Sequence, residues 1–380
     1  MPDVIQYAAW SNGGVDVARE LLKPKNLKTR VAEDARTVNR PVCELRHVEH
    51  LDSTPPFPVV DMHAHFGPLL LGENYERAFD TKRTCEILRE MGIEKIFCLE
   101  LVWGEAYDRL CRKLEASDGM ILPVGSVDVF RAMDPDFGKI VRATVRDLKA
   151  KGCVALKLWK NMTLMGAEHF GRNLRLDDPH YEPLWTAAGE FRLPVVIHVA
   201  DPPCFFRPIT PDNEHYTCLS QHPEWSFHKP GILSFEEHME MQENVIRNHP
   251  ETTFVVAHVG SYAENLVQVA AWMERYPNMY VDVAARLDQL GRQPYSAKAF
   301  IERFQDRVLF GTDYEGRFDA ARTRSFYHTH FRFFQTRDEY FDHPFPDMLG
   351  QWKICGLGLA EPVLRKLYHD NATRIFNLGA

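Results

Sequence analysis

Two histidines stand two residues apart near the end of the first long apolar run, Val59-Val60-Asp61-Met62-His63-Ala64-His65-Phe66. Side chains on a β-strand alternate between its faces, so His63 and His65 are predicted to point the same way. Two imidazole nitrogens placed in this way can converge on one metal ion, and imidazole is a common ligand of zinc and related metals. The H-x-H spacing therefore predicts a metal site at this strand end.

Three more apolar, strand-like runs end in a residue that can bind a metal, namely His198, His258 and Asp313. Each of these residues taken alone also has an ordinary interpretation as a hydrogen-bonded core side chain. Four such endings in one chain favour a shared site, provided that the fold brings the four strand ends together.

Eight short segments rich in Val, Ile and Phe are predicted to be strands that are covered on both faces. Amphipathic segments with helical spacing lie between them, and two of these stop at Gly92 and Gly152. The predicted strands are 59–66, 93–101, 121–127, 154–159, 194–199, 253–259, 279–284 and 307–312. The predicted helices are 81–91, 134–151, 181–192, 234–248, 263–276, 295–305 and 361–376.

Eight strands that alternate with helices indicate an α/β fold of the (β/α)₈ TIM-barrel type. An open, doubly wound sheet is the alternative, and it would bind ligands at a switch point of the strand order. Strands one, five, six and eight of a closed barrel surround one mouth. The barrel therefore explains the four ligand-type strand ends, and the open sheet does not.

The predicted barrel domain covers residues 58–380, and residues 1–57 form an N-terminal extension with a helix-like stretch at 15–22. Two long segments exceed a minimal barrel, at 201–233 after the fifth strand and at 315–359 after the eighth. Long loops at this end of barrel strands usually shape the substrate pocket.

Composition excludes several classes of protein. The chain of 380 residues has a formal net charge of -8, which disfavours a nucleic-acid partner. It contains no apolar run long enough for a membrane helix and no signal-peptide pattern at its start. Its eight cysteines form no C-x-x-C pair, which favours a reducing cytoplasm over a disulfide framework.

The ordered set of D-x-H-x-H at 61–65, His198, H-V-G from His258 and G-T-D ending at Asp313 resembles the amidohydrolase superfamily. More narrowly, it resembles the amidohydrolase-related (amidohydrolase 2) family of metal-dependent TIM-barrel hydrolases, decarboxylases and hydratases. The resemblance spans about residues 59–376. It implies that His63, His65, His198 and Asp313 bind one divalent metal, with zinc expected first and manganese or another metal as alternatives. It also implies that His258 contacts substrate or transfers a proton, and it allows a homodimer.

The chemistry of these side chains agrees with the resemblance. Three neutral imidazoles and a carboxylate leave room for water, and a divalent ion lowers the pKa of a bound water. Asp313 and His258 are the predicted catalytic residues: ionised Asp313 accepts a proton, and His258 assists the scissile group or the leaving atom.

Four further residues are predicted to contact substrate. Arg286 and Arg317 follow the seventh and eighth strands, where a guanidinium can pair with a substrate carboxylate. Lys157 and Trp159 end the fourth strand, and some amidohydrolases use a carbamylated lysine there to bridge two metals. One metal is expected here, with Lys157 as a pocket residue.

We predict a metal-dependent hydrolase that acts on an ester, lactone or amide of a small carboxylated molecule. Non-oxidative decarboxylation or hydration on the same site is the first alternative, because the family includes such lyases. A barrel that binds metal without catalysis is the second.

Overall fold

The computed structural model describes residues 43–46, 48–164, 169–346 and 348–379. The predicted helix-like stretch at 15–22, and most of the predicted N-terminal extension, lie outside these described residues. Within them, no helix is both long enough and apolar enough to span a membrane.

All eight predicted strands are present, in the predicted order and with shorter bounds. Each pairs in parallel with its neighbours. All seven residues of β1 are buried, as expected for a strand covered on both faces. The strands are β1 (Val59–His65), β2 (Ile93–Leu99), β3 (Ile121–Val124), β4 (Leu156–Trp159), β5 (Val195–His198), β6 (Phe254–Val256), β7 (Met279–Asp282) and β8 (Val308–Leu309).

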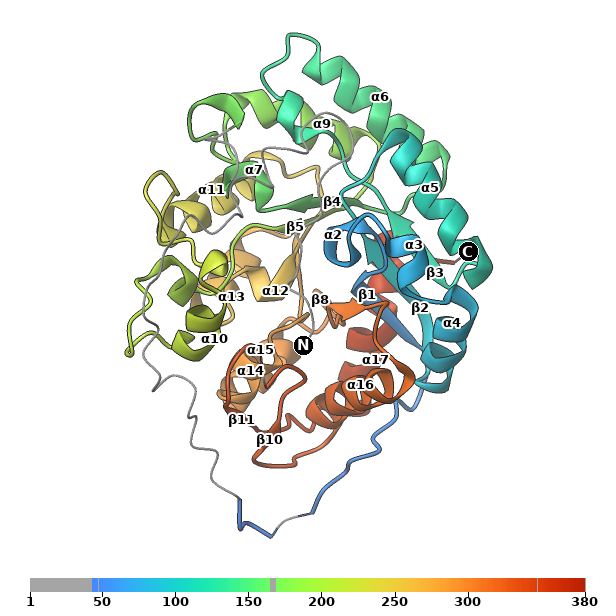
Figure 1. Cartoon of the computed structure of the whole chain (residues 1–380), viewed down its shortest axis with the longest axis vertical. Helices are drawn as coiled ribbons and strands as arrows, with labels where there is room; N and C mark the ends of the chain where they lie inside the picture. Colours follow the sequence, from blue (N-terminus) through green and yellow to red (C-terminus); the bar gives the residue numbers. More distant parts are fainter. Residues whose placement is uncertain (1–42, 47, 165–168, 347, 380) are drawn as a thin grey trace.

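The strands form two sheets, in the orders β3-β2-β1-β9 and β4-β5-β6-β7-β8. Backbone contacts join the sheets at both edges. A parallel bridge connects Gly125 with Leu156, between β3 and β4. At the other edge the N–H of Met62 in β1 donates to the carbonyl of Phe310, directly after β8, at 3.0 Å, and β9 (Tyr314–Glu315) pairs with the end of β1. The strands thus run around the middle of the molecule with helices outside them, which is the predicted TIM barrel (Figure 1).

The helices between the strands match the predicted segments within a few residues. Ser234 and Glu237 form a capping box that starts α11, and Asp80 caps α4. The outer helices are α4 (Thr81–Glu90), α5 (Gly104–Leu114), α6 (Phe137–Ala150), α9 (Glu182–Glu190), α11 (Phe235–Asn248), α13 (Leu266–Arg275), α15 (Pro294–Arg303), α16 (Ala320–Gln335), α17 (Glu361–Arg365) and α18 (Asn371–Phe376).

Two helical details differ from the sequence prediction. Helix α5 had no predicted counterpart, although it buries Tyr107, Leu110 and Leu114. The predicted closing helix at 361–376 is interrupted by a π-helical turn at Lys366–Asp370, between α17 and α18. The backbone N–H of Phe310, directly after β8, donates to the carbonyl of Leu367 in this turn at 2.9 Å.

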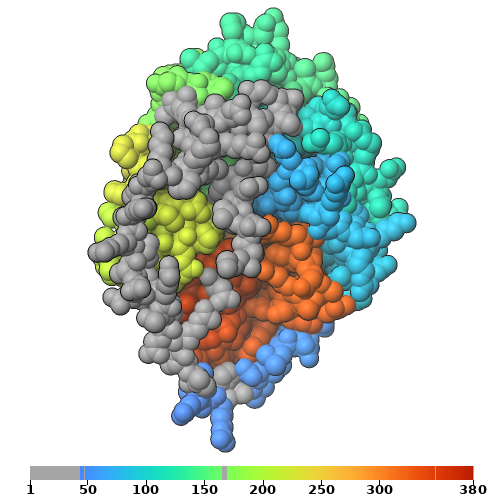
Figure 2. Space-filling model, viewed as in Figure 1, coloured from blue at the N-terminus to red at the C-terminus, as the bar shows by residue number. Residues whose placement is uncertain are grey.

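The two long segments after β5 and β8 both contain regular secondary structure, and the helix predicted within 315–359 is present as the 16-residue α16. The first holds α10 (Tyr216–Gln221) and short 3₁₀ turns. The second holds α16 and a two-stranded hairpin of β10 (Phe341–Asp342) and β11 (Lys353–Ile354). An ion pair of 2.6 Å from Arg324 to Glu90 joins α16 to α4, and Figure 2 shows these early and late parts of the chain adjoining.

A separate apolar cluster fills the interior of the barrel. It draws residues from strands on both sheets, including Val60, Phe97, Val196 and Leu309, and all of these are buried. The ring of Phe376 lies 4.6 Å from that of Phe97, between ring centroids. Helix α18 therefore closes one end of the barrel and leaves the opposite, carboxyl-terminal end of the strands for the site.

Phe310, directly after β8, packs against the rings of Phe331, Phe334 and Tyr368 and is fully buried. Phe310→Ala is expected to lower the free energy of unfolding by about 3–5 kcal/mol, because it leaves a cavity at the barrel seam. Urea denaturation measures the change.

Tyr295→Ala serves as the matched control, since Tyr295 is 91% exposed. Its effect is expected to stay within about 0.5 kcal/mol. Equal effects of the two substitutions would contradict the packing role of Phe310.

Candidate active site

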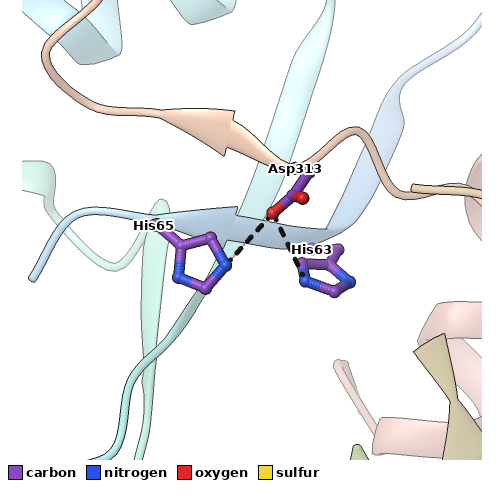
Figure 3. A group of neighbouring side chains, drawn as sticks. All are labelled: His63, His65 and Asp313. Atoms are coloured by element: carbon purple, nitrogen blue, oxygen red, sulfur yellow. Dashed lines mark ion pairs between the residues drawn. The ribbon is translucent and has the colours of Figure 1, made fainter. Parts of the chain in front are cut away.

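His63 and His65, at the end of β1, both face the carboxylate of Asp313 (Figure 3). Oδ1 of Asp313 lies 3.5 Å from Nε2 of His63 and 3.1 Å from Nε2 of His65. The three ligand-type atoms lie within 4.8 Å of one another. The predicted convergence of the H-x-H pair with the end of strand eight is thus present in the structure.

The turn that carries Asp313 packs tightly against β1. A Cβ at Gly311 would lie only 2.9 Å from Cβ of His63, so this close approach requires glycine. Asp313 itself has φ of 67°, in the left-handed region, and its N–H donates to the carbonyl of His63 at 2.8 Å. A strained non-glycine backbone of this kind is common at functional sites.

Two buried carboxylates stand behind the imidazoles. Asp282, the last residue of β7, accepts a hydrogen bond from Nδ1 of His63 at 2.8 Å. Glu100, directly after β2, lies 3.6 Å from Nδ1 of His65 and accepts the N–H groups of Gly67 and Leu69. The bond to Asp282 fixes the proton of His63 on Nδ1, so Nε2 presents its lone pair to the centre.

The sequence analysis missed Asp282 and Glu100. A signal for both was present, because each stands at the carboxyl end of an apolar strand, as the predicted ligands do.

Asp61 joins β1 to the turn before Asp313. Its carboxylate accepts four hydrogen bonds, from N–H of His63 (3.1 Å), N–H and Oγ1 of Thr312 (3.1 and 2.6 Å), and the hydroxyl of Tyr327 (2.8 Å). Burial raises the pKa of Asp61 to about 7, while these donors favour its charged form. Asp61 is therefore a positioning residue that sets the distance between His63 and Asp313.

His258 and His198 lie beside this group. The ring centroid of His258 is 4.9 Å from that of His63 and 4.3 Å from that of His198. Nδ1 of His258 donates to the carbonyl of Ala284 at 2.8 Å, which leaves Nε2 as an acceptor. His258 has φ of 59°, because the chain turns sharply at the end of β6. His63 also forms a second group of close ligand-type atoms with His258 and Asp282. The predicted ligand His198 belongs to neither group that contains His63, and its Nε2 lies 3.3 Å from Oδ1 of Asp201.

The electrostatics separate neutral imidazoles from an ionised carboxylate. Burial lowers the pKa of His198 to about 3 and lowers that of His258 well below its ordinary value, so both rings are neutral. Burial opposes ionisation of Asp313, but His63 and His65 outweigh it and hold the pKa of Asp313 well below its usual range. Neutral imidazoles and a carboxylate are the forms that bind a metal.

His65 differs from the other histidines. Burial lowers its pKa, but Asp313 and Glu100 outweigh burial and raise it to about 9. The cluster thus attracts a positive charge to the point between His65 and Asp313. A divalent cation satisfies this attraction, and the donor set of two imidazole nitrogens and a carboxylate oxygen fits zinc or manganese.

A cavity of about 150 Å³ opens onto the cluster. A cavity of this size can hold a benzene-sized molecule. Lys157, Lys160 and Arg286 contribute positive charges to its wall, and Lys160 forms an ion pair with Asp201. The apolar part of the wall consists of Leu69, Leu70, Trp159, Phe205, Trp225, Phe345, Met348 and Leu349.

Three of the four residues predicted to contact substrate line this cavity, and the fourth does not. Lys157, Trp159 and Arg286 line the cavity, and burial lowers the pKa of Lys157 to about 8. Arg317 is not among the residues that line it. The side chain of Arg317 is 41% exposed and pairs at 2.6 Å with Glu315, which does line the cavity.

A family model described as amidohydrolase matches residues 105–378, well over half of the chain. The chain belongs to the amidohydrolase family. The match includes His198, His258 and Asp313 but begins after β1, so His63 and His65 lie outside it. No curated protein matches this amidohydrolase in sequence.

Solved structures share its fold at low identity. An uncharacterised TIM-barrel protein from Bordetella bronchiseptica has a TM-score of 0.52 and 16% identity, over 84% of this chain and 99% of that chain. 2,6-Dihydroxybenzoate decarboxylase from Rhizobium has a TM-score of 0.51 and 15% identity, over 85% of this chain and 99% of that chain. 5-Carboxyvanillate decarboxylase from Novosphingobium aromaticivorans, crystallised with manganese and a nitrobenzoic acid, has a TM-score of 0.50 and 13% identity, over 87% of this chain and 100% of that chain.

Asp61→Asn is expected to destabilise this amidohydrolase by about 3 kcal/mol, because the amide cannot accept all four hydrogen bonds and leaves buried donors unpaired. Tyr327→Phe removes one of the four donors and is expected to cost about 1 kcal/mol. Thermal or urea unfolding compares the two variants, and an equal cost would argue against the clamping role of Asp61.

Proposed function

We propose that this protein is a metal-dependent hydrolase that acts on an ester, lactone or amide of a small carboxylated molecule. The observation that carries the proposal is the meeting of two imidazole Nε2 atoms and one carboxylate oxygen, within 4.8 Å, at the floor of a cavity lined by cations and aromatic side chains.

His63, His65 and Asp313 are the residues best placed to hold the ion, with His198 and His258 next to them. We expect one divalent ion, zinc first and manganese as the alternative, since a structurally similar decarboxylase was crystallised with manganese. A bound divalent ion lowers the pKa of water and polarises a substrate oxygen.

The remaining steps belong to side chains of the chain itself. Asp313 is ionised and can accept a proton from the attacking water. His258 already donates Nδ1–H to Ala284, so its Nε2 must take up a proton before it can give one to the leaving atom. The resting site therefore holds two bases, which suits water activation.

Substrate binding is assigned to the cavity wall. Arg286 is 6% exposed and Lys157 is 1% exposed, so a carboxylate beside them is shielded from water and pairs strongly. Trp159 and the other apolar side chains suit a ring or short hydrocarbon body.

Non-oxidative decarboxylation is the second candidate. The cationic, aromatic-lined cavity would also hold a small aromatic acid, and two structurally similar proteins are decarboxylases of such acids. Hydration is the related lyase reaction, as in the similar 4-oxalomesaconate hydratase from Rhodopseudomonas palustris. A product assay separates the classes, because hydrolysis forms a new carboxylic acid from the ester, lactone or amide, decarboxylation releases carbon dioxide, and hydration does neither.

Replacing both His63 and His65 by Ala is expected to abolish metal binding at this centre and all turnover, with folding retained. Mass spectrometry of metal content per chain, beside circular dichroism, checks this. Asp282→Asn is the graded variant: it removes the acceptor of His63 Nδ1 and is expected to weaken metal binding about 10–100-fold. Asp342→Asn, at an exposed ion pair with Lys353, is the control that should bind metal normally.

Asp313→Asn keeps the shape of the site but removes its ionised base. Turnover is expected to be lost even when the metal is restored by excess. A variant that retains turnover of an ester or lactone would exclude Asp313 as the base.

If the native chain converts no member of ester, lactone, amide and carboxylic-acid panels while binding metal, the non-catalytic interpretation replaces the enzyme proposal.

Arg286→Ala is expected to raise KM for a carboxylated substrate about tenfold or more, because a charged hydrogen bond contributes roughly 1.5–3 kcal/mol. Arg317→Ala is the matched variant and is expected to leave KM nearly unchanged, since Arg317 is half-exposed and paired with Glu315. Steady-state kinetics measure KM of both variants for a carboxylated substrate and for its methyl ester, which lacks the carboxylate charge. The opposite ranking would assign carboxylate binding to Arg317.

A further inference from the structure

A second group of ligand-type side chains lies in the segment after β5. Sγ of Cys204, a carboxylate oxygen of Glu214 and a ring nitrogen of His215 lie within 4.8 Å of one another. None of these residues belongs to the cluster around His63. The combination of thiol, imidazole and carboxylate is typical of zinc and similar metals.

His215 is the unusual member of this group. It is 2% exposed, and within the described part of the chain neither ring nitrogen makes a hydrogen bond of good geometry, although the backbone of Leu349 lies near the ring and favours its protonated form. Its ring packs between those of Phe205 and Trp352, with centroids 5.3 and 5.0 Å away. Buried imidazole nitrogens without partners are rare, and a metal would satisfy one of them.

The backbone around the group is already fixed. The side-chain amide of Asn213 donates to the carbonyl of Cys204 at 2.8 Å, and its oxygen accepts the N–H of His215 at 2.9 Å. Asn213 thus holds the two halves of the site together. A site arranged in advance loses little conformational freedom when a ligand binds.

Two further carboxyl groups lie near this group of residues. Both carboxylate oxygens of Glu264 are buried without a hydrogen-bond partner among the described residues, and so is one oxygen of Asp288. Burial raises the pKa of Glu264 to about 7 and that of Asp288 to about 6. A bound cation would favour the ionised forms of Glu264 and Asp288. Arg286 and Arg292 act in the opposite sense at His215, whose pKa they lower, and Arg292 also pairs with Oε1 of Glu214.

We propose that Cys204, Glu214 and His215 form a second metal site, separate from the catalytic centre, that binds a divalent transition metal of the zinc class. The proposal does not rest on the function proposed above. Because His215 and Phe205 line the catalytic cavity, an ion held here fixes one wall of that cavity.

The proton balance of binding is defined. Burial raises the pKa of the Cys204 thiol, and the charges of Glu264 and Glu214 raise it further, so the thiol is protonated at neutral pH. On binding, the S–H bond breaks, the sulfur donates its electron pair to the metal, and one proton passes to solvent. Burial lowers the pKa of His215 to about 4, so its ring is already neutral and releases none.

Cobalt(II) added to the full chain tests the site, because a thiolate ligand gives a near-ultraviolet charge-transfer band that imidazole and carboxylate ligands do not give. The band is expected to saturate at about one equivalent, with release of about one proton per ion bound at this site. It should persist in the His63→Ala, His65→Ala double variant, which separates it from the catalytic centre.

Cys204→Ser is expected to abolish the band, and His215→Ala to weaken cobalt binding at least about tenfold. Cys218→Ser is the matched control, since Cys218 is equally buried in the same small apolar cluster, and it should keep the band. Absence of a band in the native chain, or a band that survives Cys204→Ser, would overturn the proposal; the latter would point to another thiol such as the exposed Cys43. If a variant fails to fold, absence of the band in the native chain still overturns the proposal, and loss of the band in His215→Ala still supports it.

Discussion

The carboxylate of Asp61 is the contact on which the end of the barrel with the candidate active site depends. It lies where β1 meets the segment that leaves β8, and it accepts hydrogen bonds from both segments and from Tyr327 on α16. Beside it, the backbone of Thr312 and Asp313 reaches the carbonyl of His63. The seam that joins β8 to β1 is thus also the place where Asp313 meets the imidazoles. A change in this seam would alter the closure of the barrel and the geometry of the centre together.

The acidic side chains of the site lie on both sides of the imidazoles. Asp282 and Glu100 lie behind the imidazoles, and Asp313 lies in front of them. In a medium of low dielectric, these carboxylates would repel one another strongly without positive charge between them. Lys157 and a protonated His65 supply part of that charge in the metal-free chain. A divalent cation held by His63, His65 and Asp313 would supply more and would favour the neutral form of His65, so that metal binding would depend on pH.

The sequence predicted the strand order and the convergence of His63, His65 and Asp313 because these depend on local patterns. Continuous apolar runs identify strands covered on both faces, and strand ends meet at one mouth of a parallel barrel. The partners Asp282 and Glu100 were missed because a strand-end acid has many ordinary roles, and only the distance to an imidazole distinguishes them. Arg317 shows the same limit. Its position four residues after Asp313 fixes its distance along the chain but not the placement of its side chain, which pairs with Glu315 and does not line the cavity.

The segment after β5 connects the two sites described here. His198 ends β5 beside the catalytic cluster, and Asp201 links it to Lys160 on the cavity wall. Cys204 follows three residues later, and Phe205 and His215 both face the cavity. His215 then packs on Trp352, just before β11 in the segment after β8. An ion on Cys204 and His215 would therefore brace the wall where the two long segments meet. Its effect should reach substrate binding through the position of this wall, while the charges of Asp313 and His258 remain set by their own neighbours.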